Sequence, residues 1–216
     1  LSLPSTLSRR SVSSSKLPLL RMIASLHEPD LNVRELEEII SQDLSLSYKL
    51  LRYLASPLFP TRNIDSIRSA ILYLGKRNIA NWATLLALSS CDDQPPERIV
   101  SLLIRGHTCE KLALNTCTGQ SETAFTIGLF SGIDAVLDAT LELVCKELPL
   151  SDVTKQALLH RSGPYGALLA ATLAQEQGQW DAISQLGFPP ALLSEIYIDA
   201  VRCADDQWAW LSQAIK

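Results

Sequence analysis

Asp43-Leu-Ser-Leu-Ser-Tyr-Lys-Leu-Leu-Arg-Tyr-Leu-Ala-Ser56 and Arg62-Asn-Ile-Asp-Ser-Ile-Arg-Ser-Ala-Ile-Leu-Tyr-Leu-Gly75 carry the clearest pattern in this chain. Apolar residues recur in both stretches at the three-and-four spacing of a buried helical stripe. In the second stretch Asp65 stands where an N-cap belongs, and Gly75 can close the helix. The two stretches therefore predict two helices packed against each other.

The rest of the chain repeats this helical spacing, and no segment alternates like a strand. Asn32 followed by Glu35 predicts a capping box at the start of a helix. The turn Cys91-Asp-Asp-Gln-Pro-Pro96 predicts a joint between a helical subdomain at residues 17–90 and a second one at 96–216. We expect an all-α bundle of about ten helices, with those outside the quoted stretches at residues 17–26, 32–42, 76–90, 97–115, 122–137, 141–148, 152–160, 165–176, 179–186 and 190–215, the last broken in two.

The composition is that of a globular protein. Of the 216 residues, 47% are hydrophobic and 19% are charged, which excludes a disordered chain. No apolar run approaches the roughly 20 residues that a membrane span needs. The net charge is −4 and the basic residues are scattered, so nucleic acid is not expected as a partner.

The ends and the cysteines suggest context. Residues 1–16 are rich in serine and begin with Leu1, which predicts a flexible linker within a longer protein; a divergent start of a stand-alone protein stays open. The five cysteines form no Cys-x-x-Cys pair, which favours reduced thiols and a cytoplasmic location.

The order of these motifs resembles the HDOD domain, a non-catalytic relative of the HD metal-dependent phosphohydrolases found in bacterial signalling proteins. The resemblance extends from about residue 17 to about 210, so residues 17–216 are expected to form this domain. The residues that carry it most clearly are Asp43, Leu51, Arg52, Ser56, Arg62, Ile64, Ser66, Ile67, Ala70, Leu74 and Gly75. Four later segments resemble the variant that follows an EAL domain in cyclic di-GMP signalling proteins: Trp82-Ala-Thr-Leu-Leu-Ala-Leu88, Arg105-Gly-His-Thr-Cys-Glu-Lys-Leu-Ala113, Ala124-Phe-Thr-Ile-Gly-Leu-Phe-Ser131 and Gly163-Pro-Tyr-Gly-Ala-Leu-Leu169.

HD enzymes hold a divalent metal with a His on one helix, a His-Asp pair on the next and a later Asp. The resemblance places Ser131 and Gly132 at the positions of the pair, and neither is an effective ligand. His107 falls near the first ligand position, with Glu110 three residues on; pairing of this His with its neighbouring carboxylate is the simpler interpretation. We therefore expect no metal, no cofactor and no enzymatic activity.

Three tryptophans near the C-terminus, Trp180, Trp208 and Trp210, form a candidate interaction surface, although packing in the core is the simpler interpretation. Trp208 and Trp210 lie two residues apart and cannot face the same way on a helix.

The resemblance implies a regulatory module that binds a protein: its own upstream EAL domain, a second copy in a homodimer, or a downstream signalling protein. Two alternatives remain open. One is a cryptic HD-type phosphohydrolase that uses His107, and the other is a sensor that holds a small ligand in the vacated metal cavity. Partner, input signal and oligomeric state are beyond the sequence.

Overall fold

The computed structural model describes residues 17–28, 30–54, 64, 66–89 and 95–215. These ranges contain helices and no β-strand, which confirms the all-α prediction. The helices are α1 (Leu17–Leu26), α2 (Val33–Gln42), α3 (Leu44–Leu54), α4 (Ile67–Leu74), α5 (Lys76–Ser89), α6 (Pro96–Thr116), α7 (Ser121–Phe130), α8 (Ile133–Leu137), α9 (Leu141–Glu147), α10 (Asp152–His160), α11 (Gly163–Glu176), α12 (Trp180–Gln185) and α13 (Pro190–Ile215).

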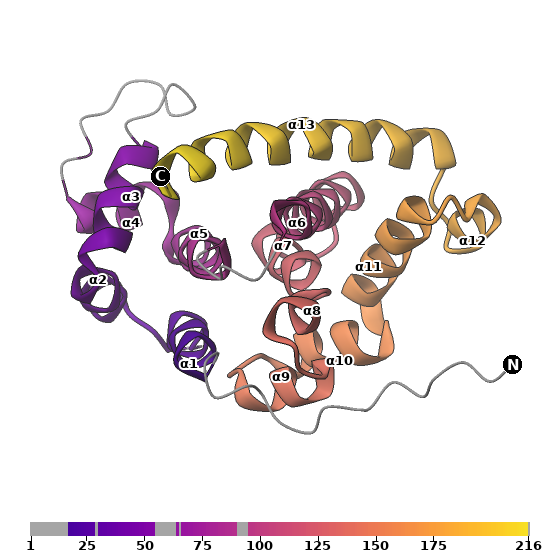
Figure 1. Ribbon diagram of the computed structural model, residues 1–216. Coiled ribbons are helices and arrows are strands. Elements are labelled where there is room, and N and C mark those ends of the chain that lie inside the picture. Colours follow the sequence, from indigo (N-terminus) through magenta and orange to yellow (C-terminus); the bar gives the residue numbers. More distant parts are fainter. Residues whose placement is uncertain (1–16, 29, 55–63, 65, 90–94, 216) are drawn as a thin grey trace, which may run out of the picture.

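Helices α6 and α7 lie at the centre of the molecule (Figure 1). Helices α1 to α5 are grouped on one side of this pair, while α11 and α12 lie on the other, with α8 to α10 below. Helix α13 runs along the top from α12 to the α3 end, and it contacts α3, α6 and α11. The C-terminal helix therefore joins both halves of the bundle.

The first helices form as their residues predict. The Asn32 side chain accepts hydrogen bonds from the backbone N–H groups of Arg34 and Glu35, and the Glu35 carboxylate accepts from the Asn32 N–H, so the predicted capping box is present. In α3, Leu46 and Leu50 are buried. These caps satisfy backbone donors that a helix start leaves unpaired, and the apolar stripe then directs each helix into the core.

Two helix boundaries differ from the prediction. The segment expected as one helix at residues 122–137 is divided into α7 and α8, because the backbone at Gly132 leaves the helical region (φ −136°, ψ 17°). The segment at 190–215, expected to break, is the continuous helix α13. No proline or glycine follows Pro190 in it, so nothing in its backbone forces a break.

The N-cap of α4 is Ser66 and not Asp65 as expected, because the Ser66 hydroxyl accepts from the Ser69 N–H. Some other expectations fall outside the described residues: the linker at 1–16, the family-motif residues Ser56 and Arg62 and most of the joint at 91–96. The side chain of Trp210 is also not described. The division into subdomains at 17–90 and 96–216 stays a prediction. None of the described helices combines the length and the apolar character that a membrane span requires.

The central pair is held in backbone contact by glycine. A Cβ added to Gly128 of α7 would lie 2.3 Å from the carbonyl oxygen of Arg105 and 2.7 Å from the Cα of Gly106, both in α6. Such distances are far inside van der Waals contact, and both atoms belong to rigid backbone. Only glycine at 128 allows α6 and α7 to approach this closely.

We predict that Gly128→Ala lowers the free energy of unfolding by about 3 kcal/mol or more, because the added methyl group must push two helix backbones apart. Gly106→Ala is the matched control. Its Cβ would meet only the Phe125 ring, at 3.0 to 3.1 Å, and a side chain can yield, so a loss of about 1 kcal/mol is expected. Urea denaturation measures both, and equal losses would contradict this account of the crossing.

Candidate functional site

Helix α6 presents two polar faces on either side of Gly106. Arg105 and His107 lie two positions apart, so their side chains point in directions about 200° apart around the helix. Gly106, between them, packs against Phe125 of α7. The two faces form separate environments.

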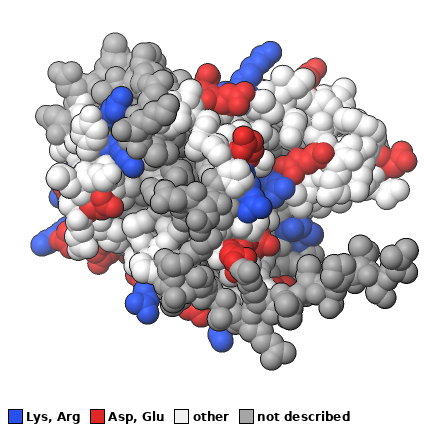
Figure 2. Space-filling model, viewed as in Figure 1, with Lys and Arg blue, Asp and Glu red and all other residues white. Residues whose placement is uncertain are grey.

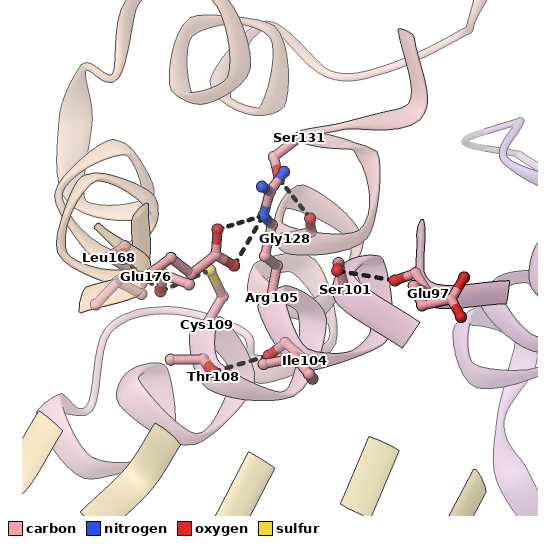
Figure 3. Close-up of polar contacts among 11 residues, drawn as sticks. Glu97, Ser101, Ile104, Arg105, Thr108, Cys109, Gly128, Ser131, Leu168 and Glu176 are labelled. Carbon is pink, nitrogen blue, oxygen red and sulfur yellow. Dashed lines mark hydrogen bonds and ion pairs between the residues drawn. The ribbon is translucent and has the colours of Figure 1, made fainter. Parts of the chain in front are cut away.

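On the Arg105 face, α6 forms an ion pair with α11 (Figure 3). The Arg105 Nε donates to both carboxylate oxygens of Glu176, at 2.9 and 3.0 Å. The side chains are 23% and 18% exposed, so the pair is largely withdrawn from water. Partial burial strengthens the attraction, and charge-assisted bonds of this kind are the strongest hydrogen bonds that proteins form.

The same guanidinium lies against Gly132, which with Ser131 is one of the two positions where the sequence predicts replaced metal ligands. A Cβ added to Gly132 would lie 2.8 Å from the Arg105 Nη1 atom, so the absence of a side chain makes room for this group. The Ser131 hydroxyl donates to the Gly128 carbonyl oxygen at 2.7 Å, beside the guanidinium in Figure 3. The cation at this place in the fold is therefore a side chain of the protein.

The residues here do not fit a metal ion. Across the described ranges, no three His, Cys, Asp or Glu side chains are grouped so that they could hold one. The residues of α6 that face Gly132 are Arg105 and Leu102, and His107 lies on the other face of the helix. Both ring nitrogens of His107 are also engaged, Nδ1 with Glu110 at 3.2 Å and Nε2 with Gln207 at 2.9 Å.

The His107 face lines a cavity of about 170 Å³, which we call the small cavity. Trp82 of α5 and Phe125 of α7 contribute aromatic walls. Asn81 of α5 is 3% exposed, and its Oδ1 accepts from the Thr126 hydroxyl at 3.2 Å. Its Nδ2 is buried without a hydrogen-bond partner. An unpaired buried donor costs about 1–3 kcal/mol, so a hydrogen-bond acceptor in the small cavity would be stabilising.

A larger cavity of about 850 Å³ adjoins the small one. The two share Leu74 and Asn78 as lining residues. Lys76 and Arg77, at the start of α5, line the large cavity, and helix starts favour negative charge.

His27 also lines the large cavity. Its Nε2 lies 3.1 Å from the Thr84 hydroxyl, and its ring packs edge-on against Phe130. Loss of water around the ring, and secondarily the positive charge of Arg77, lower the pKa of His27 from 6.5 to about 3. His27 is therefore neutral at pH 7.

The described family-motif residues serve the fold. Asp43 accepts from the Leu46 N–H at 3.0 Å, and Ser66 accepts from the Ser69 N–H at 3.1 Å, so each caps a helix. Gly75 takes a left-handed φ of 84° between α4 and α5. The side chain of Arg52 is exposed. The apolar side chains are buried or half-buried: Leu51, Ile64, Ile67, Ala70 and Leu74.

The tryptophans predicted as an interaction surface have different environments. Trp180 of α12 is 49% exposed, whereas Trp208 of α13 packs in part against the core. The two most exposed apolar side chains of the described chain lie elsewhere, on the neighbouring helices α3 and α4: Leu44 at 83% and Leu72 at 68%, with Tyr48 of α3 at 60%. Acidic and basic side chains are interspersed on the face shown in Figure 2.

An all-α bundle of this order, with the motifs of α3 and α4 in these structural roles, defines the class to which the protein belongs. A sequence model of the HDOD domain matches residues 17–148. The chain belongs to the HDOD domain family.

Three comparisons describe its neighbours. The chain is 32% identical over 210 residues to "Cyclic di-GMP phosphodiesterase CdgJ" of Vibrio cholerae, covering 94% of this chain and 49% of that protein. It is 34% identical to YuxH of Bacillus subtilis, covering 85% of this chain and 46% of that protein. It therefore spans about half the length of these curated relatives. A crystal structure from Marinobacter aquaeolei, described as that of a proposed signal-transduction protein, shares the fold with a TM-score of 0.63 at 16% identity; the match covers 92% of this chain and 59% of that one.

One expectation needs correction. The lost ligand pair at Ser131 and Gly132 predicted that no enzymatic activity is involved. The relative from Vibrio cholerae, aligned over nearly all of this chain, is named as a phosphodiesterase, and this finding overturns the prediction. The physical reason for the error is that Ser131 and Gly132 bear on one metal site only. They say nothing of activity elsewhere in the protein.

Sequence reasoning missed Glu176, Asn81 and Gln207 as site residues. Glu176 and Gln207 come from α11 and α13, far along the chain from their partners in α6. Asn81 did leave a signal, because it is a polar residue flanked by Ile79, Ala80, Trp82 and Ala83 in the predicted helix.

We predict that Glu176→Gln lowers the free energy of unfolding by about 1–2 kcal/mol, since it leaves the Arg105 charge half-buried without its counter-ion. The matched control is Glu38→Gln, which breaks the exposed pair of Arg34 and Glu38 (81% and 58% exposed) and should cost less than about 0.5 kcal/mol. Denaturant titration separates the two. Indistinguishable losses would show that burial adds nothing to the Arg105 pair.

His27 predicts a pH dependence. Its pKa is lower in the folded state, so between pH 6.5 and about 3 the unfolded state binds more protons and stability is lost as the pH falls. Between pH 7 and pH 5 the His27 contribution should fall by about 1–2 kcal/mol. His27→Gln should remove that part of the slope, whereas His160→Gln, at an exposed position, should retain it. Identical slopes in both variants, measured by urea denaturation, would refute the assignment.

Proposed function

We propose that this chain is the regulatory HDOD region of a bacterial signal-transduction protein that hydrolyses cyclic di-GMP. The observation that carries the proposal is the alignment of 94% of the chain with a relative named as a cyclic di-GMP phosphodiesterase. The family match at residues 17–148 supports a signalling context. Four unpaired cysteines among the described residues, two of them buried, are in keeping with a cytoplasmic location.

In this proposal the chain acts through a protein contact, and its partner is an EAL domain that precedes it in the same protein. The relatives are about twice as long as the match, which leaves room in them for a domain of that size. The contact surface we assign is the α3–α4 face, defined by Leu44, Tyr48 and Leu72, because it carries the two most exposed apolar side chains of the described chain, Leu44 and Leu72. Leu44 and Tyr48 are four residues apart and share one side of α3.

Regulation requires that the two helical regions at 17–90 and 96–216 have more than one arrangement, with the EAL domain favouring one of them. Helix α13 is suited to transmit such a change, since it contacts α3 at one end and α6 along its length. A homodimer formed through the α3–α4 face, or a downstream protein bound there, would use the same surface.

The proposal predicts that the full-length protein, with an EAL domain before Leu1, hydrolyses cyclic di-GMP at a rate that depends on the α3–α4 face. The double variant Leu44→Ser and Tyr48→Ser should change this rate by a factor of about five or more, the range of a typical coupling energy. Leu114→Ser is the control, because Leu114 is a 64% exposed leucine on α6. A rate unchanged by the double variant, or changed equally by the control, would reject the proposed surface.

The same assay tests hydrolysis by this chain alone. The candidate residue for such a site is His107, which is paired with Glu110 at the cavity wall. The 216-residue chain is assayed with Mn²⁺ and its metal content is measured. Turnover that His107→Ala abolishes would locate a hydrolytic site here, and the regulatory role would then have to be abandoned.

A further inference from the structure

We propose that the two adjoining cavities form one binding site for a guanine nucleotide, with the base in the small cavity and its phosphate in the large one beside Lys76 and Arg77. No part of the proposed regulatory contact assigns this site. The argument rests on the unpaired amide of Asn81, on the groups that face it, and on the wall that the two cavities share.

The size and walls of the small cavity suit a flat heteroaromatic ring. A volume of about 170 Å³ holds about five or six water molecules at ~30 Å³ each, the bulk of a nucleobase. Trp82 and Phe125 line it from different helices. Aromatic side chains contact a base through its π face, and this contact is available to any base.

The polar groups of the small cavity then select the edge of the base. The Asn81 Nδ2 is buried without a hydrogen-bond partner, while the Oδ1 of the same amide lies 3.2 Å from the Thr126 hydroxyl, which also donates to the Glu122 carbonyl oxygen at 2.8 Å. The Nδ2 requires an acceptor from the ligand. Glu110 lines the same cavity and is 27% exposed; its Oε2 lies 3.2 Å from the His107 Nδ1, and the carboxylate can accept further donors.

Guanine presents an acceptor next to donors, the keto oxygen beside two N–H groups. Its acceptor satisfies Asn81 and its N–H groups satisfy a carboxylate. Adenine also carries an acceptor beside a donor, but it offers a carboxylate one amino group and no ring N–H on that edge. The choice of guanine over adenine also rests on the proposed function in cyclic di-GMP signalling.

The phosphate position follows from the shared wall. Leu74 and Asn78 border both cavities, so a nucleotide whose base fills the small cavity extends past them into the large one. Lys76 and Arg77, at the start of the 14-residue helix α5, line the large cavity.

Lys76 Nζ donates to the Leu31 carbonyl oxygen at 2.8 Å and Arg77 donates to the Thr123 hydroxyl, so a phosphate would share or replace these contacts. Glu28 and Glu122 also line the large cavity, so the phosphate must be held by Lys76 and Arg77 in the presence of two carboxylates. The exposed Lys76 and Arg77 side chains and the helix start together favour an anion there.

Calorimetric titration of the 216-residue chain with guanosine, guanosine monophosphate, cyclic di-GMP and adenosine tests the proposal. We expect guanosine to bind at least tenfold more tightly than adenosine. Both guanine compounds that carry phosphate should bind more tightly than guanosine, and Arg77→Gln should remove that advantage. The tighter of the two identifies whether a mononucleotide or the cyclic dinucleotide is the ligand.

Asn81→Leu and Glu110→Gln should each weaken guanosine binding at least tenfold, while Glu147→Gln, at an exposed position of α9, should leave it unchanged. Glu110 is partly exposed, so its variant stays informative if Asn81→Leu destabilises the fold, which circular dichroism would reveal. No binding of any guanine compound, equal binding of adenosine, or full binding by Glu110→Gln would overturn the site. Because no hydrolysis is measured, these outcomes are independent of the rate assay that tests the regulatory contact.

Discussion

The contact between the backbones of α6 and α7 at Gly106 and Gly128 is the constraint on which the rest of this structure depends. With no side chain at 128, the two helices meet at backbone distance, and every other helix is placed around them. The crossing fixes the rotation of α6. It thereby directs Arg105 towards α8 and α11, and His107 towards α5 and α13.

These two directions solve the problem of burying polar groups in different ways. On one side, opposite charges meet in Arg105 and Glu176, so the partly buried groups satisfy each other. On the other side, His107 satisfies Glu110 and Gln207, but the Asn81 amide is left with a donor that nothing in the described chain accepts. The Arg105–Glu176 pair therefore holds α6 against α11, whereas the Asn81 Nδ2 remains available to a ligand in the proposed site.

Sequence reasoning succeeded where structure depends on neighbours in the chain. The capping box of Asn32 and Glu35, the apolar stripe of α3 and the association of His107 with Glu110 all follow from spacings of three or four residues. It failed where partners are remote. Arg105 and Glu176 are 71 residues apart, and His107 and Gln207 are 100 apart, so no local pattern could join them. The break between α7 and α8 belongs to the same group, because Arg105 packs where a side chain at 132 would lie.

Arg105 has a further consequence, because a charged group that belongs to the chain cannot dissociate from it. The junction of α6, α8 and α11 is neutralised from within, by a guanidinium and a carboxylate that fold into place together. Removal of divalent ions therefore leaves the Arg105–Glu176 pair intact, because both of its charges are side chains of the chain itself.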